Sequence, residues 1–458
     1  SFGVSTAAQS GPNTFTAEAW IKTSTTSGGK IIGFGNNRTG DSTSYDRHVY
    51  MDNSGRINFG VFTGNTQTVT SGSSYNDDQW HHVVASMGPD GMQLYVDSKK
   101  VASRTDTTAG QVFAGYWRVG GDNLGGWPNG PASNRFAGAI DDVAVYSTVL
   151  TRQQIDAHWV ASGRASTIPA APTDAYGAAV FALEPTSFWR LGESSGSVAA
   201  DSGPFGNPGV YTGLVEKGAS GAVAGTSDTA ATFAPTEEWW GWNEAGVASA
   251  SAYSNPTSYA LEAWFKTTTT RGGKIIGFGA SQTGQSGGYD RHVFMEGDGR
   301  VTFGTWTGQE NTITSSAALN DGEWHHVVAQ QSSAGMNLFI DGASVGTNPQ
   351  TGAQDYSGYW RVGGDSAWHG AAPYFAGAID EVAVYSAPLT AEQVEQHRDL
   401  GLGIAPNVLP TAAFTSSVSD LDATFDATGS TDTDGTIVSS MWDFGDDQLG
   451  TGSTVSHT

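Results

Sequence analysis

The sequence contains no cysteine among its 458 residues. Disulfide bonds, thiolate chemistry and cysteine-ligated zinc are therefore excluded. Charged residues are scarce, at 14%, and acidic ones dominate: 45 Asp and Glu stand against 21 Lys and Arg, for a net charge of −24. Because nucleic acids and anionic membranes are bound by basic surfaces, this balance argues against either as a partner.

Long apolar runs and several catalytic motifs are also missing. No stretch of 18 apolar residues occurs, so we expect no insertion into a membrane. The zinc-protease pattern His-Glu-x-x-His is absent. So is Glu-x-Asp-x-x-Glu, the spacing that sets two carboxylates on one strand in laminarinase-type glucanases. The sequence therefore gives little support for catalysis.

What the sequence does contain is a long duplication. Glu-Ala-Trp at 18–20 returns at 262–264, and Tyr-Asp-Arg-His-Val at 45–49 returns at 289–293, both with an offset of 244 residues (262 − 18). A period of this length indicates a duplicated domain. Two copies of one module favour a multivalent binder over a single-site enzyme.

The chain divides into four parts. We expect a first module at 1–163, a proline-bearing linker at 164–173, a second module at 174–402 and a third unit at 403–458. The second module has a long segment before its repeated strands that has no counterpart in the first. Since the chain opens at Ser1 without methionine, we expect it to be a fragment, with the edges of the first module covered by missing chain segments or by neighbouring subunits.

Alternating apolar and polar residues, punctuated by Asp-Gly and Ser-Gly turns, predict short antiparallel strands throughout. The helical signal closes each module. Thr151 and Thr390 are predicted N-caps, and Gln154 and Gln393 complete capping boxes. We expect no helix elsewhere.

Several spaced motifs carry a family resemblance. Trp-His-His-Val-Val at 80–84 and Gly-Ala-Ile-Asp-Asp-Val-Ala-Val-Tyr at 138–146, both repeated in the second module, resemble laminin G-like, concanavalin A-like modules of secreted bacterial proteins. Asp-Gly-Thr-Ile at 434–437 and Trp-Asp-Phe-Gly-Asp at 442–446 resemble a PKD (polycystic kidney disease-type) domain. The resemblance implies an all-β chain: two concanavalin A-like antiparallel β-sandwiches (jelly rolls) and a partial immunoglobulin-like β-sandwich. It also implies an extracellular protein that binds a polysaccharide or a cell-surface glycan or protein, often near calcium.

Calcium requires six to eight oxygen ligands. Asp201 and Asn207 bracket an oxygen-rich loop, and Asp380 in the closing strand could complete a site there, because the first and last strands of a jelly roll are often neighbours. Asp141 is the counterpart of Asp380 in the first module, which lacks an equivalent of Asp201. The alternative is that Asp201 caps a turn and Asp380 accepts a backbone amide. The loop at 432–435 is a weaker calcium candidate.

The repeated Tyr-Asp-Arg-His block is the most distinctive polar pattern. Strict alternation would place Asp46 and His48 on one face of a strand and Tyr45 and Arg47 on the other. Planar charged groups and aromatic faces bind sugars, so the block and a Trp-Arg pair downstream supply candidate ligand-binding residues: Arg47, His48, Trp117 and Arg118, then Arg291, His292, Trp360 and Arg361. The alternative is a buried Asp–Arg pair, with both tryptophans in the core.

Other aromatic residues lie in turn-rich loops. Trp127 and Trp368 occupy related loops of the two modules, and three further tryptophans stand at 239, 240 and 242. We expect such side chains to be exposed and to form a binding platform.

The adjacent histidines at 81–82 and 325–326 point to opposite faces of a strand, so we expect a structural role rather than a shared metal. The preceding Trp80 and Trp324 are expected in the core.

The sequence thus favours a non-catalytic extracellular protein whose tandem lectin-like modules bind glycan or a surface partner. Two alternatives stay open: a building block of a surface appendage or phage tail fibre, and an accessory region of a secreted polysaccharide hydrolase.

Overall fold

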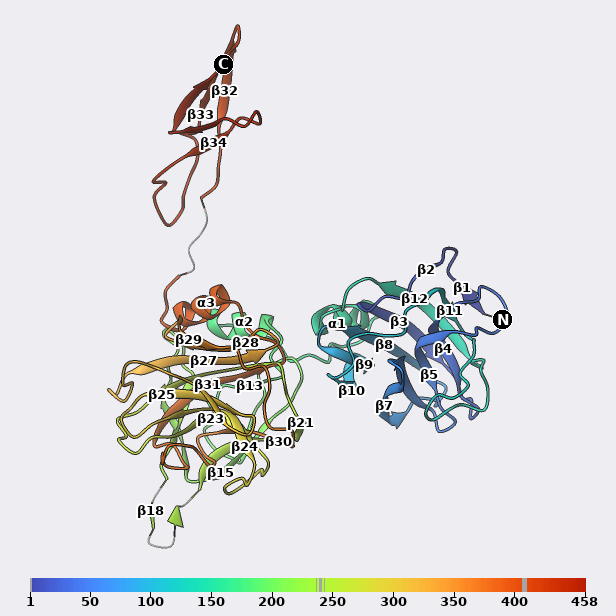
Figure 1. Cartoon of the computed structure of the whole chain (residues 1–458), viewed down its shortest axis with the longest axis horizontal. Coiled ribbons are helices and arrows are strands. Elements are labelled where there is room, and N and C mark those ends of the chain that lie inside the picture. Colours follow the sequence, from blue (N-terminus) through green and yellow to red (C-terminus); the bar gives the residue numbers. More distant parts are fainter. Residues whose placement is uncertain (1, 236, 239–240, 243, 406–409) are drawn as a thin grey trace.

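The computed structural model describes the chain apart from residues 1, 236, 239–240, 243 and 406–409. Three β-rich units follow one another along the chain (Figure 1). We call residues 1–163 module 1, residues 174–402 module 2 and residues 403–458 the third unit. Antiparallel sheets dominate all three, which confirms the predicted all-β class.

Module 1 is a sandwich of two antiparallel sheets. The first runs in the order β1 (Gly3–Val4), β11 (Ala114–Val119), β4 (Gly29–Gly35), β5 (Tyr45–Met51), β6 (Arg56–Phe62) and β7 (Thr66–Ser74), and β2 (Gln9–Ser10) also pairs with β11. The second runs in the order β10 (Lys99–Arg104), β9 (Gly91–Val96), β8 (Trp80–Gly88), β3 (Phe15–Lys22) and β12 (Ala139–Tyr146). Apolar side chains from both sheets, such as Ile21, Phe34 and Leu94, form one fully buried core.

Module 2 repeats this sandwich and extends it. One sheet runs β16 (Val215–Ser220), β17 (Thr229–Phe233), β31 (Gly377–Tyr385), β22 (Tyr259–Lys266), β27 (Trp324–Ser332), β28 (Gly335–Ile340) and β29 (Ala343–Asn348), with β13 (Ser187–Trp189) also paired to β31. The other runs β14 (Val198–Ala199), β15 (Gly209–Gly213), β20 (Ala245–Ser249), β30 (Ser357–Val362), β23 (Gly273–Gly279), β24 (Tyr289–Met295), β25 (Val301–Trp306) and β26 (Glu310–Thr314), with β21 (Tyr253–Ser254) paired to β30. A short hairpin of β18 (Glu237–Glu238) and β19 (Gly241–Trp242) projects from this module.

The closing helices are α1 (Arg152–Ala161) and α3 (Ala391–Gly401). The predicted threonines are their N-caps, and both capping boxes form. Each threonine hydroxyl accepts the backbone N–H of the glutamine three residues later, and the glutamine side-chain oxygen accepts the threonine N–H.

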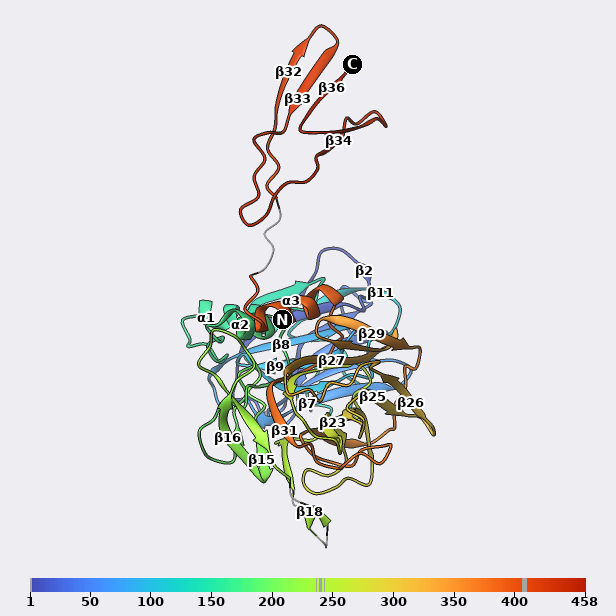
Figure 2. The same ribbon diagram turned by 90° about the vertical axis from the view of Figure 1, so that its left-hand side faces the viewer.

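A third helix, α2 (Ala175–Ala182), contradicts the expectation of no further helix. Its N-cap is Asp174, whose carboxylate accepts the N–H of Gly177 at 2.8 Å. It lies beside α3 over the outer face of module 2 (Figure 2). The segment Ala-Tyr-Gly-Ala-Ala-Val-Phe-Ala is apolar on every side, so it offers no amphipathic pattern to recognise.

The third unit contains a sheet of β32 (Thr415–Ser419), β33 (Asp422–Asp426) and β36 (Thr454–His457), and a hairpin of β34 (Met441–Asp443) and β35 (Leu449–Thr451). Its apolar centre is aromatic. The ring of Phe425 lies 5.6 Å from Trp442 and 5.7 Å from Phe444. The tryptophan of the predicted PKD motif is therefore part of this packing.

The two modules touch at the start of α1. The carboxylate of Glu184, just after α2, accepts the backbone N–H groups of Arg152 and Gln153, each at 3.0 Å. A carboxylate is favourable at a helix N-terminus, where N–H groups lack partners. Lys100 of module 1 also lies 4.3 Å from the ring centre of Phe205 in module 2. The predicted linker between them has no helix or strand.

Candidate ligand-binding site

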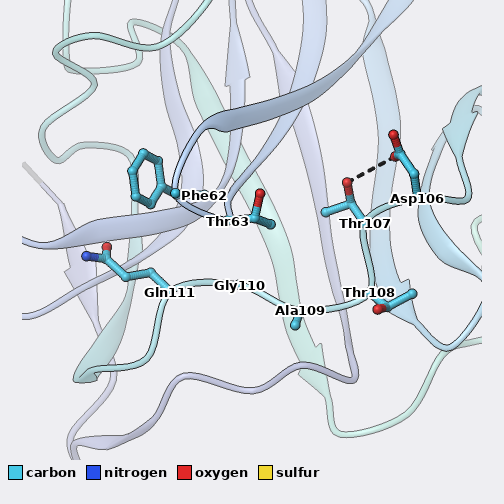
Figure 3. Close-up of a pocket in the computed structure, with 9 residues that line it drawn as sticks. Phe62, Thr63, Asp106, Thr107, Thr108, Ala109, Gly110 and Gln111 are labelled. Atoms are coloured by element: carbon cyan, nitrogen blue, oxygen red, sulfur yellow. Dashed lines mark hydrogen bonds between the residues drawn. The ribbon is translucent and has the colours of Figure 1, made fainter.

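A cleft of about 400 Å³ opens at one end of module 1. Phe62, Thr63 and Gly64, at the turn from β6 to β7, form one wall, and the loop at 106–111 between β10 and β11 forms the other. Figure 3 shows Phe62 and Thr63 above the loop that carries Ala109, Gly110 and Gln111. The ring of Phe62 is half-buried, whereas Thr63 and Thr108 are exposed.

A buried carboxylate ties the two walls together. Asp46 Oδ1 accepts the N–H of Phe62 at 2.7 Å, and its Oδ2 accepts the N–H of Gln111 at 2.8 Å. Arg47 donates to Asp46 Oδ2 at 2.9 Å and to the carbonyl oxygen of Gln111 at 3.0 Å. Its Nε also donates to the carbonyl oxygen of Pro12 at 2.7 Å. The pair therefore fixes the shape of the cleft before any ligand arrives.

Burial acts on both charged groups of this pair. Neither side chain is exposed to solvent. Burial raises the pKa of Asp46, against the opposing effect of the Arg47 charge, and lowers the pKa of Arg47. The hydrogen bonds to backbone amides and carbonyls keep these buried groups satisfied.

The strict alternation predicted for this strand is wrong. Arg47 has a φ of 52°, and the register between β4 and β5 shifts there, since Ile32 pairs with Val49 while Phe34 pairs with Asp46. This β-bulge turns Arg47 back toward Asp46 instead of to the opposite face. Module 2 repeats it, because Arg291 has a φ of 47° and donates to Asp290 at 2.6 Å.

Module 2 has the same Asp–Arg pair, but in module 2 a glutamine side chain crosses between the two loops. Trp306 stands at the position of Phe62, and its backbone N–H donates to Asp290 Oδ2 at 3.1 Å. Gln350 stands where module 1 has Thr107 (350 − 107 = 243, the offset that aligns Tyr116 with Tyr359). Its amide donates to Thr307 and Asn311, both at 3.4 Å. These bonds join the two loops that the cleft separates in module 1.

Two family models match this chain. The family model described as the concanavalin A-like lectin/glucanases superfamily matches residues 3–156 and 243–395, and a PKD domain model matches residues 405–458. The chain belongs to the concanavalin A-like lectin/glucanases superfamily. No curated protein sequence matches it.

Similar solved structures have low sequence identity and low TM-scores. Domains LG4-5 of the mouse laminin α1 chain are 16% identical, with 82% of this chain and 86% of that chain covered and a TM-score of 0.24. Domain 4 of AbnA, an extracellular arabinanase from Geobacillus stearothermophilus solved with arabinotriose, is 19% identical over 48% and 98% of the two chains, with a TM-score of 0.31. The CBM40 of the Ruminococcus gnavus IT-sialidase, bound to α2,3-sialyllactose, is 20% identical over 30% and 80%, with a TM-score of 0.26.

The predicted ligand-binding residues lie inside these concanavalin A-like modules. Arg47, His48, Arg118, Arg291, His292 and Arg361 are 0% exposed. Trp117 and Trp360 pack in the two main cores, so the core alternative describes them correctly. Arg118 donates to the carbonyl oxygen of Asn37 at 2.5 Å, and Arg361 to that of Ser281 at 2.6 Å. As placed, none of these side chains presents a free group to a ligand.

The prediction of exposed loop tryptophans is wrong for Trp127 and Trp368, which are only 7% and 8% exposed. Each loop folds back over its sheet, and each indole meets a buried histidine edge to face, His48 at 4.6 Å and His292 at 4.4 Å between ring centres. Removing an indole from water is favourable, and this favours a loop conformation that folds back over the sheet. Residues 239 and 240 lie outside the described residues, and nothing is described of the side chain at 242.

The adjacent histidines point to opposite faces of their strand, as expected. His82 binds Glu18 at 2.8 Å, whereas His81 binds Asp77 at 2.9 Å and Asp97 at 2.8 Å on the opposite face. The core placement of Trp80 and Trp324 is wrong, because both are only half-buried.

The predicted calcium ligands are occupied by backbone amides. Asp201 accepts the N–H groups of Phe188, Gly203 and Asn207 at 2.6–2.8 Å, while Asp380 accepts those of Ala222 and Glu381. Asp141 accepts the N–H of Asp142 at 3.0 Å. Across the described ranges, no group of three or more His, Cys, Asp and Glu side chains is arranged to hold a metal. Calcium binding at these residues stays a prediction.

The cleft itself was not predicted. Its residues are ordinary loop residues, and the one usable signal was the Asp46–Arg47 block that anchors both walls. In the described part of the chain, no helix is long and apolar enough to cross a membrane.

Proposed function

We propose that this chain is a non-catalytic extracellular binding protein that recognises a glycan through the cleft of module 1. The observation that supports the proposal is the composition of the cleft. A half-buried ring, Phe62, lies beside exposed hydroxyl groups of Thr63 and Thr108 and the carboxylate of Asp106. A ring can stack on the C–H face of a sugar, while hydroxyl and carboxylate groups bond its hydroxyls.

The frame of the cleft is preorganised for binding. The Asp46–Arg47 pair holds both walls, so little ordering entropy would be lost on binding. Asp106 is itself oriented by Arg104, which donates to it at 2.6 and 2.8 Å. In this proposal module 2 and the third unit position module 1. Several copies of the protein bound to one glycan-bearing surface would add avidity.

The second candidate is a structural role as a building block of a surface appendage. It is favoured by the open edge of module 1 described below, which invites assembly with another strand. In that case soluble glycans would not bind.

The experiment is a glycan array probed with the labelled chain, followed by calorimetry on the best ligand. Phe62→Ala should weaken binding at least about tenfold, equivalent to about 1.4 kcal/mol. Trp306→Ala, the matched change in module 2, should leave it within about twofold, since Gln350 spans that loop pair. Circular dichroism checks that both variants fold.

Two results would refute the proposal. One is an array with no specific glycan. The other is equal weakening by Phe62→Ala and Trp306→Ala, which would place the ligand away from the cleft of module 1.

A further inference from the structure

The outer edge of β12 is open, whereas the matching edge of β31 is covered. β12 is the last strand of its sheet among the described residues. Val143 and Val145 are each 39% exposed, yet their counterparts Val382 and Val384 are 0% and 2% exposed. Module 1 therefore leaves uncovered an apolar strand that module 2 treats as core.

Module 2 shows what fits such an edge. β13 pairs antiparallel with β31, with Phe188 opposite Ala383 and Trp189 opposite Val382. The indole of Trp189 points into the main core and is fully buried. The residues of a strand alternate between faces, so Trp189 fills the sandwich while its neighbour Arg190 points outward.

Arg190 is the polar anchor of this strand. Its guanidinium lies 2.6 Å from Glu381, 2.6 Å from Asp174 and 2.7 Å from Asp228. Charge-assisted bonds of this kind are short and directional. They fix the register of β13 against β31.

Module 1 keeps one of the three carboxylates of this arrangement. Asp142 stands at the position of Glu381 and has the same left-handed backbone, with φ of 44° against 51°. Its side chain is exposed. Beside it lies a hollow of about 170 Å³ lined by Trp20, Trp80, Asp141, Asp142, Ser162 and Arg164.

We propose that the open edge of β12 binds an extended strand of a partner polypeptide. The strand runs antiparallel to β12, places a large apolar side chain against Val143 and Val145, and follows it with an arginine that pairs with Asp142. Backbone hydrogen bonds supply affinity and the alternating side chains supply selectivity, as in other cases of strand addition.

A second copy of this chain is a poorer occupant. Pairing β12 with itself would bring Asp141 and Asp142 of two copies close together. Each copy also carries a net charge of −24. Like charges at an edge oppose strand pairing, whereas an arginine-bearing strand is complementary to the same edge.

The test uses the chain and a labelled peptide, Thr-Ser-Phe-Trp-Arg-Leu-Gly-Glu, which copies residues 186–193. We expect saturable binding by fluorescence anisotropy and slower amide hydrogen exchange across residues 139–146. Exchange across Gly377–Tyr385, already paired in module 2, should not change and serves as the internal control.

Charge reversal gives the sharper result. Asp142→Arg in the chain should weaken binding of the peptide at least about tenfold, and a peptide with Arg190→Glu should restore it on that variant. Because Asp142 is exposed, the variant should keep its fold, which calorimetry checks.

Absence of saturable binding, or binding without protection of 139–146, would overturn the proposal. So would a dimer in light scattering whose protection maps to 139–146 without peptide, because the edge would then pair with itself.

Discussion

The same four residues, Val-Ala-Val-Tyr, end the closing strand of both modules, at 143–146 and at 382–385. In module 2 they are core, because β13 pairs with their edge and Trp189 covers their inner face. In module 1 they are partly exposed, because β3 pairs with one edge of β12 and no described strand pairs with the other. The comparison teaches that an identical strand becomes core or surface according to its neighbours.

A buried polar network on the outer face shows the same contrast. Glu262 is fully buried and accepts bonds from His326, His397, Tyr176 and Tyr385. Its counterpart in module 1 is Glu18, which contacts His82 and the partly exposed His158. Tyr176 belongs to α2, and no matching helix occurs in the described residues of module 1.

The largest expected effect comes from placing a charge on the two matching strands. Val382→Asp would bury an unpaired carboxylate and should destabilise module 2 by about 4 kcal/mol or more. Val143→Asp, at the exposed match, should change the free energy of unfolding of module 1 by no more than about 0.5 kcal/mol. Calorimetry with local hydrogen exchange measures both, and equal effects would mean that the edge of β12 is covered in solution.

A second comparison removes the charge of the buried glutamate. Glu262→Gln should destabilise module 2 by about 3–5 kcal/mol, because the histidines around it lose their buried counter-charge. Glu18→Gln should cost module 1 about 1–2 kcal/mol, since water reaches His158. Urea unfolding of each variant tests the difference, and a larger loss in module 1 would contradict it.

The pH dependence of stability should differ between the two modules, because the glutamate network is fully buried only in module 2. Burial favours neutral Glu262, but the two histidines outweigh burial and hold its pKa well below the ordinary 4.5. Burial likewise favours neutral His397, but Glu262 outweighs it and raises the pKa of His397 above 6.5. Glu262, whose pKa is lowered, stabilises the folded state above pH 4.5, and this contribution is lost as the pH falls. His397, whose pKa is raised, stabilises the folded state below pH 6.5, and this contribution is lost as the pH rises.

Module 2 should therefore be most stable between about pH 4.5 and 6.5 with respect to this network. Outside that window its stability should fall by up to about 1.4 kcal/mol per pH unit for each proton. His81 and His325, each held between two aspartates, have raised pKa values in both modules, so they do not create a difference. Melting curves of Glu262→Gln should show a flatter profile, and an unchanged profile would exclude this network as the cause.

The smallest effect should be equal in both modules. Thr151→Ala and Thr390→Ala each remove a capping box and should cost about 1 kcal/mol. The caps have the same geometry and are local, so the difference between modules should vanish here. Unequal losses would show that contacts of α1 or α3 beyond the cap contribute.

Local patterns predicted much of the fold. The duplication, the capping boxes and the opposite-facing histidines follow from spacing alone, and the family motifs indicated two sandwiches and a PKD unit. The helix α2 was missed because its segment is apolar on every side, and a one-sided pattern is what sequence analysis can detect.

The site was less accessible to prediction. The Asp46–Arg47 block was recognised, but its bulge was not, because a left-handed arginine leaves no signal in the sequence. Trp127 and Trp368 were assigned to the surface because their loops are rich in turns, yet each loop folds over a buried histidine. The cleft joins residues 62–64 to 106–111, segments whose proximity depends on sheet topology.

By itself the sequence determined most of the strand periodicity and the helix caps, because these depend on residues close together in the chain. The tertiary structure decided which matching strand is covered, which tryptophans are core and where a cleft remains. Those outcomes depend on surfaces brought together from distant segments, and burial of apolar area is a property of the assembled sandwich rather than of any one strand.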